Sequence, residues 1–379
     1  MIRHYLDHNA TTPARPEVIE AVSGWMAHIG NASSVHREGR AAHGVVETAR
    51  ESLADALQAP AAGVVFTGSG TEAIHLALHG ATRAHGVKRL FISAIEHTAV
   101  LDNARGAGLE VEIIPVQPTG VVDLDWLKDR LADYDPKKDG AFLVAMMLAN
   151  NETGVIQPVA DIVDLAHGAG GLVFCDAAQG VGKIPVHFEQ LGVDMMSLAA
   201  HKFGGPMGVG ALLLRNGLSL EPVLRGGGQE LRRRAGTINV PCVAGLGVAA
   251  RLLPDTIARV EKRANLRNDI ERAVVQSGAR IWGADSKRLP GTVSFSVDGF
   301  PAETQLMLLD LTGIAVSSGA ACSSGKAEPS HVLTAMGATE DEAQSSIRVS
   351  LGWSSTKADA VAFIREWTAA CKRIKAKAA

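Results

Sequence analysis

The chain contains few cysteines, only four in 379 residues, at positions 175, 242, 322 and 371. No two of them have the C-x-x-C spacing that is typical of zinc sites, and so few in so long a chain exclude a disulfide-stapled fold. We therefore expect no bound metal. Cys175 and Cys371 lie in apolar strand and helix patterns, where a small buried side chain is the simplest interpretation.

The sequence also lacks long hydrophobic runs. The longest, residues 141–149, is far shorter than the ~20 apolar residues of a membrane-spanning helix. The first seven residues lack the apolar core of a signal peptide. We therefore expect a cytoplasmic protein that has no membrane partner.

Neither sign of charge is in large excess, because 37 basic residues stand against 40 acidic ones, for a net charge of −3. Such a chain has no global field to attract nucleic acid, so we do not expect nucleic acid as a partner. With 46% hydrophobic and 20% charged residues, the composition is that of a globular protein. The length suits one large and one small domain.

Apolar segments of strand length alternate with amphipathic helical patterns from residue 64 to residue 214. This alternation predicts an α/β fold whose mostly parallel sheet is covered by helices on both faces. After Pro241 the pattern predicts one long helix over 243–277, followed by a second, smaller α/β unit. We assign residues 13–250 to the large domain, and residues 1–12 together with 251–379 to the small domain.

Two predicted strands end in groups that carry chemistry. The strand over 195–199 leads to His201 and Lys202, and the strand over 172–176 ends in Asp176. A buried lysine is a good amine nucleophile, as a Schiff-base lysine must be. A carboxylate at the same sheet edge suits the ring nitrogen of pyridoxal phosphate. A solvated loop lysine is commoner in general, but the pair together predicts a cofactor site.

A glycine-rich turn, residues 66–73, joins a predicted strand to a helix that begins near Gly70 and Thr71. The amides of that helix N-terminus and the Thr71 hydroxyl predict a phosphate site. The same letters satisfy a dinucleotide fingerprint, which is the competing interpretation. That fingerprint needs an acidic residue about 20 positions on, at the end of the next strand. Glu96 comes late and is followed by histidine, so we favour a single phosphate.

Other polar residues follow strand ends at the same edge. His97 could stack on an aromatic cofactor and move protons near neutrality. Asn151 follows another strand end, and Gln179 lies three residues after Asp176, within reach of the same ligand. Each could instead be an ordinary turn or surface residue, and only the shared edge favours a site.

Two further residues stand out in the C-terminal part. Cys322 lies in a loop of Ser, Gly and Ala, which is the setting of a mobile nucleophile, although an incidental exposed thiol is the alternative. Arg348 lies within an apolar strand. A buried arginine needs an anionic partner, and a substrate carboxylate could supply it.

These motifs resemble, in this order and along nearly the whole chain, the cysteine desulfurases, which are pyridoxal phosphate enzymes of the class V aminotransferase group. The matching segments are residues 5–13, 30–36, 66–73, 96–101, 149–154, 176–183, 201–210, 226–240, 317–325 and 348–352. The resemblance implies a fold-type I enzyme with a seven-stranded sheet and a smaller C-terminal domain. The long loop around Cys322 is similar to the branch that supplies sulfur for iron–sulfur cluster assembly, including nitrogenase-type systems.

The resemblance also implies a role for each candidate residue. Lys202 would form the Schiff base with pyridoxal 5'-phosphate, Asp176 would pair with the ring nitrogen, and Gln179 with the ring hydroxyl. His97 would lie on the ring face, and Asn151 and Arg348 would bind the substrate carboxylate, with Asn151 also among the cofactor contacts. The phosphate would be bound by Gly70, Thr71 and His201 and, across a homodimer interface, by Thr237.

By the same resemblance, the Cys322 thiolate takes sulfur from L-cysteine as a persulfide, alanine leaves, and a sulfur-acceptor protein receives the persulfide sulfur. His97 would handle the thiol protons. One departure is that Ala199 and Ala200 replace the Ser-Gly that commonly precedes His-Lys, so one phosphate hydroxyl is missing. Two alternatives stay open at this point. Another class V aminotransferase or a selenocysteine/cysteine lyase would not need Cys322, and a non-catalytic scaffold would need neither Cys322 nor Lys202.

Overall fold

The computed structural model describes residues 3–319 and 329–378. Its large sheet has seven strands in the order β2-β8-β7-β6-β5-β3-β4. They are β2 (Val64–Thr67), β3 (Val87–Ser93), β4 (Glu110–Ile114), β5 (Ala141–Met147), β6 (Leu172–Asp176), β7 (Met195–Ala199) and β8 (Gly210–Leu214). Only β8 runs antiparallel to its neighbours in this sheet. The predicted mostly parallel sheet is therefore confirmed.

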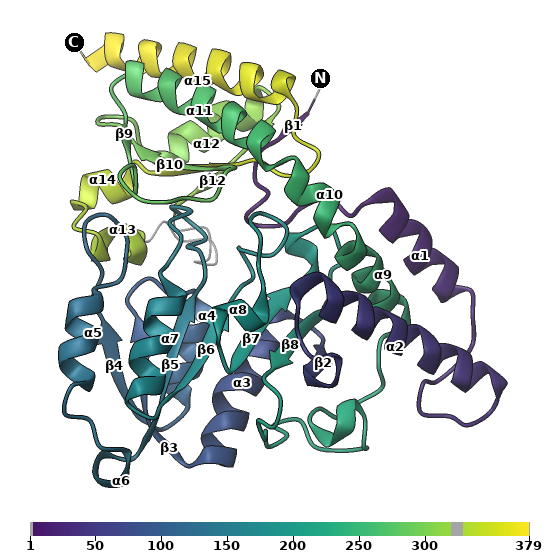
Figure 1. Cartoon of the computed structure of the whole chain (residues 1–379). Helices are drawn as coiled ribbons and strands as arrows, with labels where there is room; N and C mark the ends of the chain where they lie inside the picture. The colour runs from purple at the N-terminus through teal and green to yellow at the C-terminus, as the bar shows by residue number, and fades with distance from the viewer. Residues whose placement is uncertain (1–2, 320–328, 379) are drawn as a thin grey trace.

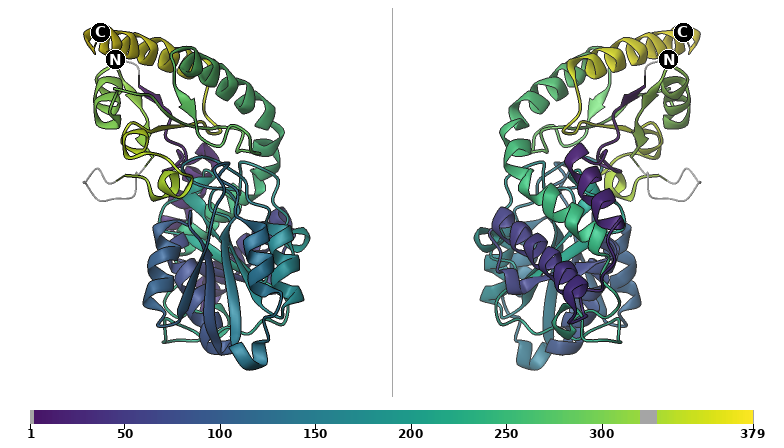
Figure 2. Two further views of the ribbon diagram at one scale, coloured as in Figure 1. Left: turned by 90° about the vertical axis from the view of Figure 1, so that its left-hand side faces the viewer. Right: turned by 90° about the vertical axis from the view of Figure 1, so that its right-hand side faces the viewer.

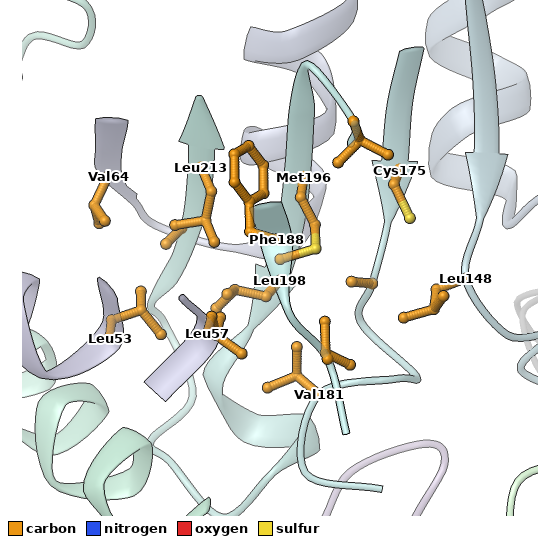
Figure 3. Close-up of a cluster of buried hydrophobic side chains, with 14 of the residues drawn as sticks. Leu53, Leu57, Val64, Leu148, Cys175, Val181, Phe188, Met196, Leu198 and Leu213 are labelled. Atoms are coloured by element: carbon orange, nitrogen blue, oxygen red, sulfur yellow. The ribbon is translucent and has the colours of Figure 1, made fainter. Parts of the chain in front are cut away.

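The strands are apolar along their whole length because both faces of the sheet are buried. In β5, Val144 and Met146 face one core, whereas Leu143 and Ala145 face the other, as the two-residue period of a strand requires. Figure 3 shows part of the first core, where side chains of β7 and β8 meet Leu53 and Leu57.

Helices cover both faces (Figure 1). The first core receives apolar residues from α2 (Arg37–Leu57), α5 (Leu124–Leu131), α7 (Val159–Gly168), α8 (Phe188–Leu191) and α9 (Val240–Arg251), and α1 (Pro16–Met26) packs on α9. The second core receives them from α3 (Gly70–His85) and α4 (Thr98–Gly106). The short α6 (Pro136–Asp139) precedes β5. These helices fix the loops that follow each strand.

The single long helix predicted over 243–277 is wrong. The chain forms α9, then α10 (Leu253–Ala258) and α11 (Val260–Gln276), with a bend of 50° after α9. Pro254 lies in the first turn of α10, where proline ends one helix and can begin the next, since it lacks an amide donor. Among the described residues no single helix is long and apolar enough to cross a membrane, and only this bent pair, taken together, would pass on length and composition.

The C-terminal part has its own antiparallel sheet, in the order β12-β13-β10-β9. Its strands are β9 (Arg280–Ile281), β10 (Thr292–Ser296), β12 (Ser317–Ser318) and β13 (Ile347–Ser350). α11, α12 (Ala302–Leu311) and α15 (Lys357–Ala378) contribute to its core. In that core the rings of Phe295 and Trp367 lie 5.1 Å apart. Figure 2 shows α15 at the end farthest from the large sheet.

The N-terminal residues belong to this smaller body. β1 (His4–Tyr5) pairs in parallel with β11 (Ile314–Ala315), and Leu6 lies in the same core. The short helices α13 (His331–Ala335) and α14 (Glu340–Gln344) lie between β12 and β13 in the sequence. The segment after Leu6 then runs to the large sheet, because the Thr12 amide donates to the His201 carbonyl at 2.9 Å.

Candidate active site

A cavity of about 260 Å³ lies at the carboxyl ends of the parallel strands. Contacts from Lys202 to Asn9, and from Arg348 to the Asn151 carbonyl, place it where the two bodies meet. Eight of the predicted residues line it: Gly70, Thr71, His97, Asn151, Asp176, Gln179, His201 and Lys202. They lie at or just after the ends of β2, β3, β5, β6 and β7, so topology alone brings them to one edge.

Asp176 is the last residue of β6 and is 7% exposed. Its Oδ1 accepts hydrogen bonds from the Ser197 hydroxyl at 3.1 Å and from the Ala178 amide at 3.0 Å. These two donors fix the position of Oδ1. Neither bond uses Oδ2, the oxygen that a protonated ring nitrogen would need.

The Lys202 amine is held by the N-terminal segment. Nζ donates to the carbonyl oxygens of Asn9, at 2.7 Å, and Ala10, at 2.8 Å. It lines the cavity, as predicted for a Schiff-base lysine. Because two backbone carbonyls hold it, the amine has a defined position before any ligand binds.

Two residues that sequence reasoning missed, Asn9 and Lys183, link this lysine to Gln179. The Asn9 carbonyl accepts from Gln179 Nε2 at 2.9 Å, and Asn9 Oδ1 accepts from Lys183 Nζ at 2.7 Å. Lys183 Nζ also donates to Gln179 Oε1. Burial, and then the charge of Lys202, hold the pKa of Lys183 well below its usual range. The sequence signal that could have identified them as site residues is that they lie inside the matching segments 5–13 and 176–183.

His97 has a fixed tautomer. It caps α4, and its Nδ1 accepts the Ala99 amide at 3.0 Å, so in the neutral ring Nε2 carries the proton. Burial lowers the pKa of His97, the Asp176 carboxylate opposes this, and Lys202 adds to it. The imidazole is therefore favoured in its neutral form, which suits stacking on a ring.

The phosphate turn has the predicted geometry of a helix N-terminus. α3 begins at Gly70, and the Ser69 hydroxyl accepts the Glu72 amide at 3.1 Å. A Cβ on Gly70 would lie 3.1 Å from the Cβ of Ala199, so the close approach favours glycine. Ala199 lines the cavity at the place where the resemblance would have put a serine.

His201 completes this end of the cavity. Its Nδ1 lies 3.1 Å from the Thr11 hydroxyl. Burial, followed by the charges of Lys202 and Lys183, lowers its pKa to about 4. A neutral imidazole can donate one hydrogen bond to a phosphate, so the amides of α3 remain the main source of positive potential.

Of the predicted residues that the structure describes, Arg348 and Thr237 do not line the cavity. Arg348 is 2% exposed, and its guanidinium donates to Asp7 Oδ1 and to the Asn151 carbonyl, at 2.7 and 2.9 Å. Thr237 lies exposed in the loop before α9. Cys322 falls in residues 320–328, outside the described part of the chain.

Two buried glutamates were also missed. Glu96 is 0% exposed, and its Oε1 accepts from the Ser93 hydroxyl at 2.6 Å and the Met147 amide at 2.9 Å. Glu152 accepts from the Ser330 hydroxyl. Burial raises the pKa of Glu96 to about 8 and that of Glu152 to about 7. Each adjoins a predicted residue, His97 or Asn151, but no spacing rule marks a buried carboxyl in advance.

Comparison with known proteins gives a consistent result. A family model described as aminotransferase class-V matches residues 4–363. The cysteine desulfurase IscS of Dictyoglomus turgidum is 40% identical over 364 residues, which cover 94% of this chain and 91% of that protein. An IscS-like cysteine desulfurase of Mycobacterium tuberculosis is 40% identical over 368 residues, covering 94% and 93%.

Solved structures agree with the sequence relatives. A NifS-like protein superposes with a TM-score of 0.91 at 33% identity, covering 98% of this chain and 100% of its own. A NifS-like protein from Rickettsia africae superposes with a TM-score of 0.89 at 35% identity, covering 99% of both chains. The likeness therefore includes both bodies of the fold and not the large sheet alone.

Proposed function

Because the chain belongs to the aminotransferase class-V family and is a cysteine desulfurase by its likeness to relatives along nearly its whole length, we propose how its residues divide the reaction. One observation carries the proposal. The Lys202 amine, the Asp176 carboxylate and the N-terminus of α3 line one cavity. We propose that L-cysteine is converted to L-alanine there and that the sulfur serves iron–sulfur cluster assembly.

The residues present fit pyridoxal 5'-phosphate. The α3 amides and the Thr71 hydroxyl suit its phosphate, Asp176 Oδ2 suits its ring nitrogen, and the neutral His97 suits its ring face. When bound, this cofactor supplies an electron sink for the substrate's α-carbon. Gln179 would donate to the ring hydroxyl, with its amide already oriented by Asn9 and Lys183.

Lys202 has two tasks in this proposal. It would hold the cofactor through its aldehyde, and its free amine would take the proton from the substrate α-carbon. The carbonyls of Asn9 and Ala10 give the displaced amine a place to rest. A lysine amine that keeps a defined position stays close to the reacting carbon, which favours turnover.

Arg348 would bind the substrate carboxylate, as the resemblance implies, together with Asn151. In the structure Asp7 occupies one arm of its guanidinium, and the Asn151 carbonyl occupies the other. When substrate binds, the guanidinium must therefore either give up its bond to Asp7 for the substrate carboxylate or bind both carboxylates. An arginine that is already paired costs less to keep buried between turnovers than an unpaired one.

The sulfur step involves Cys322. Its thiolate attacks the substrate sulfur, the carbon–sulfur bond breaks, and its electron pair stays with the carbon that becomes the methyl group of alanine. Cys322 then carries the persulfide, so one cysteine and one thiol give one alanine and one persulfide. His97 can donate from Nε2 to the substrate sulfur, but to accept a proton there it must first give up its bond to the Ala99 amide.

We further propose a cytoplasmic homodimer that passes sulfur to an acceptor protein. Thr237 is exposed and does not line the cavity of its own chain. In a homodimer it would reach the phosphate in the cavity of the second copy. Reducing cytoplasm keeps the thiol of Cys322 available. Sedimentation that finds a fully active monomer would overturn the dimer.

The function is tested by replacing each cysteine in turn with alanine and assaying sulfide, alanine and persulfide mass. The other three provide matched controls, since Cys175 and Cys371 are buried and Cys242 is partly buried. We expect only Cys322→Ala to stop sulfide release while cofactor content stays at the wild-type level. If Cys322→Ala releases sulfide at the wild-type rate, the enzyme is a lyase or an aminotransferase instead.

A further inference from the structure

Arg263, on α11, is a buried cation without a counter-ion. The residue is 5% exposed, and neither of its terminal nitrogens, Nη1 and Nη2, has a hydrogen-bond partner among the described residues. No carboxylate in that part of the chain forms an ion pair with it. Burial, and then the positive charge of Arg15, lower its pKa to about 10. A buried guanidinium normally has an anionic partner.

The guanidinium belongs to the lining of a second, much smaller cavity. Its volume is about 20 Å³, and its polar lining includes His8, Lys183, Lys202 and Thr256 besides Arg263. No acidic residue lines it. Lys202 therefore contributes to two cavities, the large one of the active site and this small one.

The charges around the small cavity are mostly of one sign. Lys183, Lys202 and Arg263 line it, and Arg15 lies close by, bonded to Thr256 and stacked 4.4 Å from the Trp353 ring. Burial, followed by Lys183, lowers the pKa of His8 to about 4, so this ring adds no charge. The nearby carboxylates are engaged elsewhere.

The charge of Asp359 acts on His8, and that of Asp7 acts on Lys183. Asp359 accepts from His4 and from the Thr356 amide, at 2.7 Å each. Asp7 pairs with Arg348. Asp255 and Glu17 act on Arg15 and not on Arg263. The positive charge of Arg263 is therefore not balanced by a carboxylate of the described chain.

We propose that this cavity binds one small monovalent anion, chloride under ordinary salt conditions, between Arg263 and Lys183. A cavity of this volume holds one water-sized species. It cannot hold cysteine or a phosphate ester, for which the active-site cavity is the proper size. Water would satisfy hydrogen bonds but leave the charge uncompensated, whereas an anion does both.

The anion would tie the two bodies of the fold together. The lining residues come from the N-terminal segment, from the turns after β6 and β7, from α10 and α11, and from the residues after β13. An ion that binds only where these segments meet stabilises the folded arrangement by mass action. It also lies beside Lys183, which orients Gln179, so the site supports the active site without contacting substrate.

The direct test is a crystal of the wild-type holoenzyme grown with sodium bromide. We expect an anomalous bromide peak within hydrogen-bond distance of Arg263, and none in Arg263→Met. In solution, replacing sodium gluconate by sodium chloride at equal ionic strength should raise the wild-type Tm by roughly 2–5 °C. Gluconate is too large for the cavity and serves as the reference anion.

The variants separate a built site from general salt effects. Arg263→Met should show no chloride response, and in gluconate it should melt above the wild type, because it has no uncompensated buried charge. Arg272→Met, an exposed arginine of the same helix, should keep the full response. Three results would each overturn the proposal. They are water alone in the wild-type cavity, a chloride response in Arg263→Met equal to that of the wild type, and a bromide peak in the crystal without any chloride response in solution. None of these readouts depends on desulfurase activity.

Discussion

The Lys202 amine donates a 2.7 Å hydrogen bond to the carbonyl oxygen of Asn9, across 193 positions of sequence. The same carbonyl accepts from Gln179 at 2.9 Å. The N-terminal segment thus positions both the Lys202 amine and the Gln179 side chain. Because this segment also pairs with β11, the smaller body of the fold holds Lys202 of the larger one.

Asn9→Ala should weaken this arrangement. The Asn9 side chain is 1% exposed and bonds Lys183, Thr292 and the Asn151 carbonyl. Its removal leaves buried groups unpaired, so we expect a loss of about 2 kcal/mol in unfolding free energy and weaker cofactor binding. Urea unfolding and cofactor titration measure the two effects. Asn31→Ala, in an exposed loop, is the control, and equal losses in both variants would contradict the account.

Glu96→Gln should change how stability depends on pH. The carboxyl pKa is about 8 in the folded protein against a usual 4.5, so the folded state holds a proton that the unfolded state has released. Wild-type stability should therefore fall as pH rises from about 4.5 to 8. The amide cannot ionise. The unfolding free energy of the variant should therefore rise relative to that of the wild type over this pH window, by on the order of 1–4 kcal/mol.

The measurement is urea unfolding of both proteins at several pH values. Glu303→Gln, an exposed glutamate of α12, should show the wild-type profile. Glu152 also has a raised pKa, of about 7, so only the difference between wild type and variant is informative. A constant difference from pH 5 to pH 8 would mean that Glu96 does not hold a proton.

Much of this arrangement could be predicted from sequence, and the reasons for success and failure are physical. Strands β6 and β7 have the predicted bounds, because strands buried on both faces are continuously apolar and Gly, Pro or polar residues end them. Topology then brings strand ends to one edge, so eight site residues were predicted to be neighbours. These inferences needed no long-range detail.

The predictions that failed, and the site residues that were missed, depended on tertiary contacts. The break at Pro254 was missed because an apolar pattern continues through it. Asn9 was missed because Lys202 and Lys183, which bond it, lie 193 and 174 positions away in the sequence. No local pattern reports such contacts, and the link from Lys183 to Asn9 was missed for the same reason. The pairing of Arg348 with Asp7 was missed for the same reason. Burial of Glu96 and Glu152 follows from packing, which a turn sequence does not reveal.

Ala199→Ser should improve cofactor binding. Ala199 is 5% exposed and lines the cavity beside the phosphate turn, so a hydroxyl there can donate to the phosphate. A hydrogen bond to a charged group contributes about 1.5–3 kcal/mol, which corresponds to roughly tenfold or more in affinity. Reconstitution of the apoenzyme with pyridoxal 5'-phosphate measures it. Ala200→Ser, which does not line the cavity, should give no gain; unchanged affinity in Ala199→Ser would show that other groups already satisfy the phosphate.

His97 can be tested by separating its cap from its ring. Asparagine caps helices well, so His97→Asn should retain stability, whereas His97→Ala should lose about 1 kcal/mol. Both remove the imidazole, and both should lower desulfurase turnover strongly and to a similar degree. Thermal unfolding and sulfide assays distinguish the two effects. Near-normal turnover in His97→Asn would show that the ring is not needed.

The central claim is that Lys202 is the lysine that reacts with the cofactor. Borohydride reduction of the holoenzyme, followed by peptide mapping, tests it most directly, because Lys183 lies in the same hydrogen-bond network and could compete. The account predicts the reduced cofactor on the peptide that contains Lys202, and none fixed in Lys202→Ala. Cofactor fixed to Lys183, or to any other lysine of the wild-type protein, would contradict it.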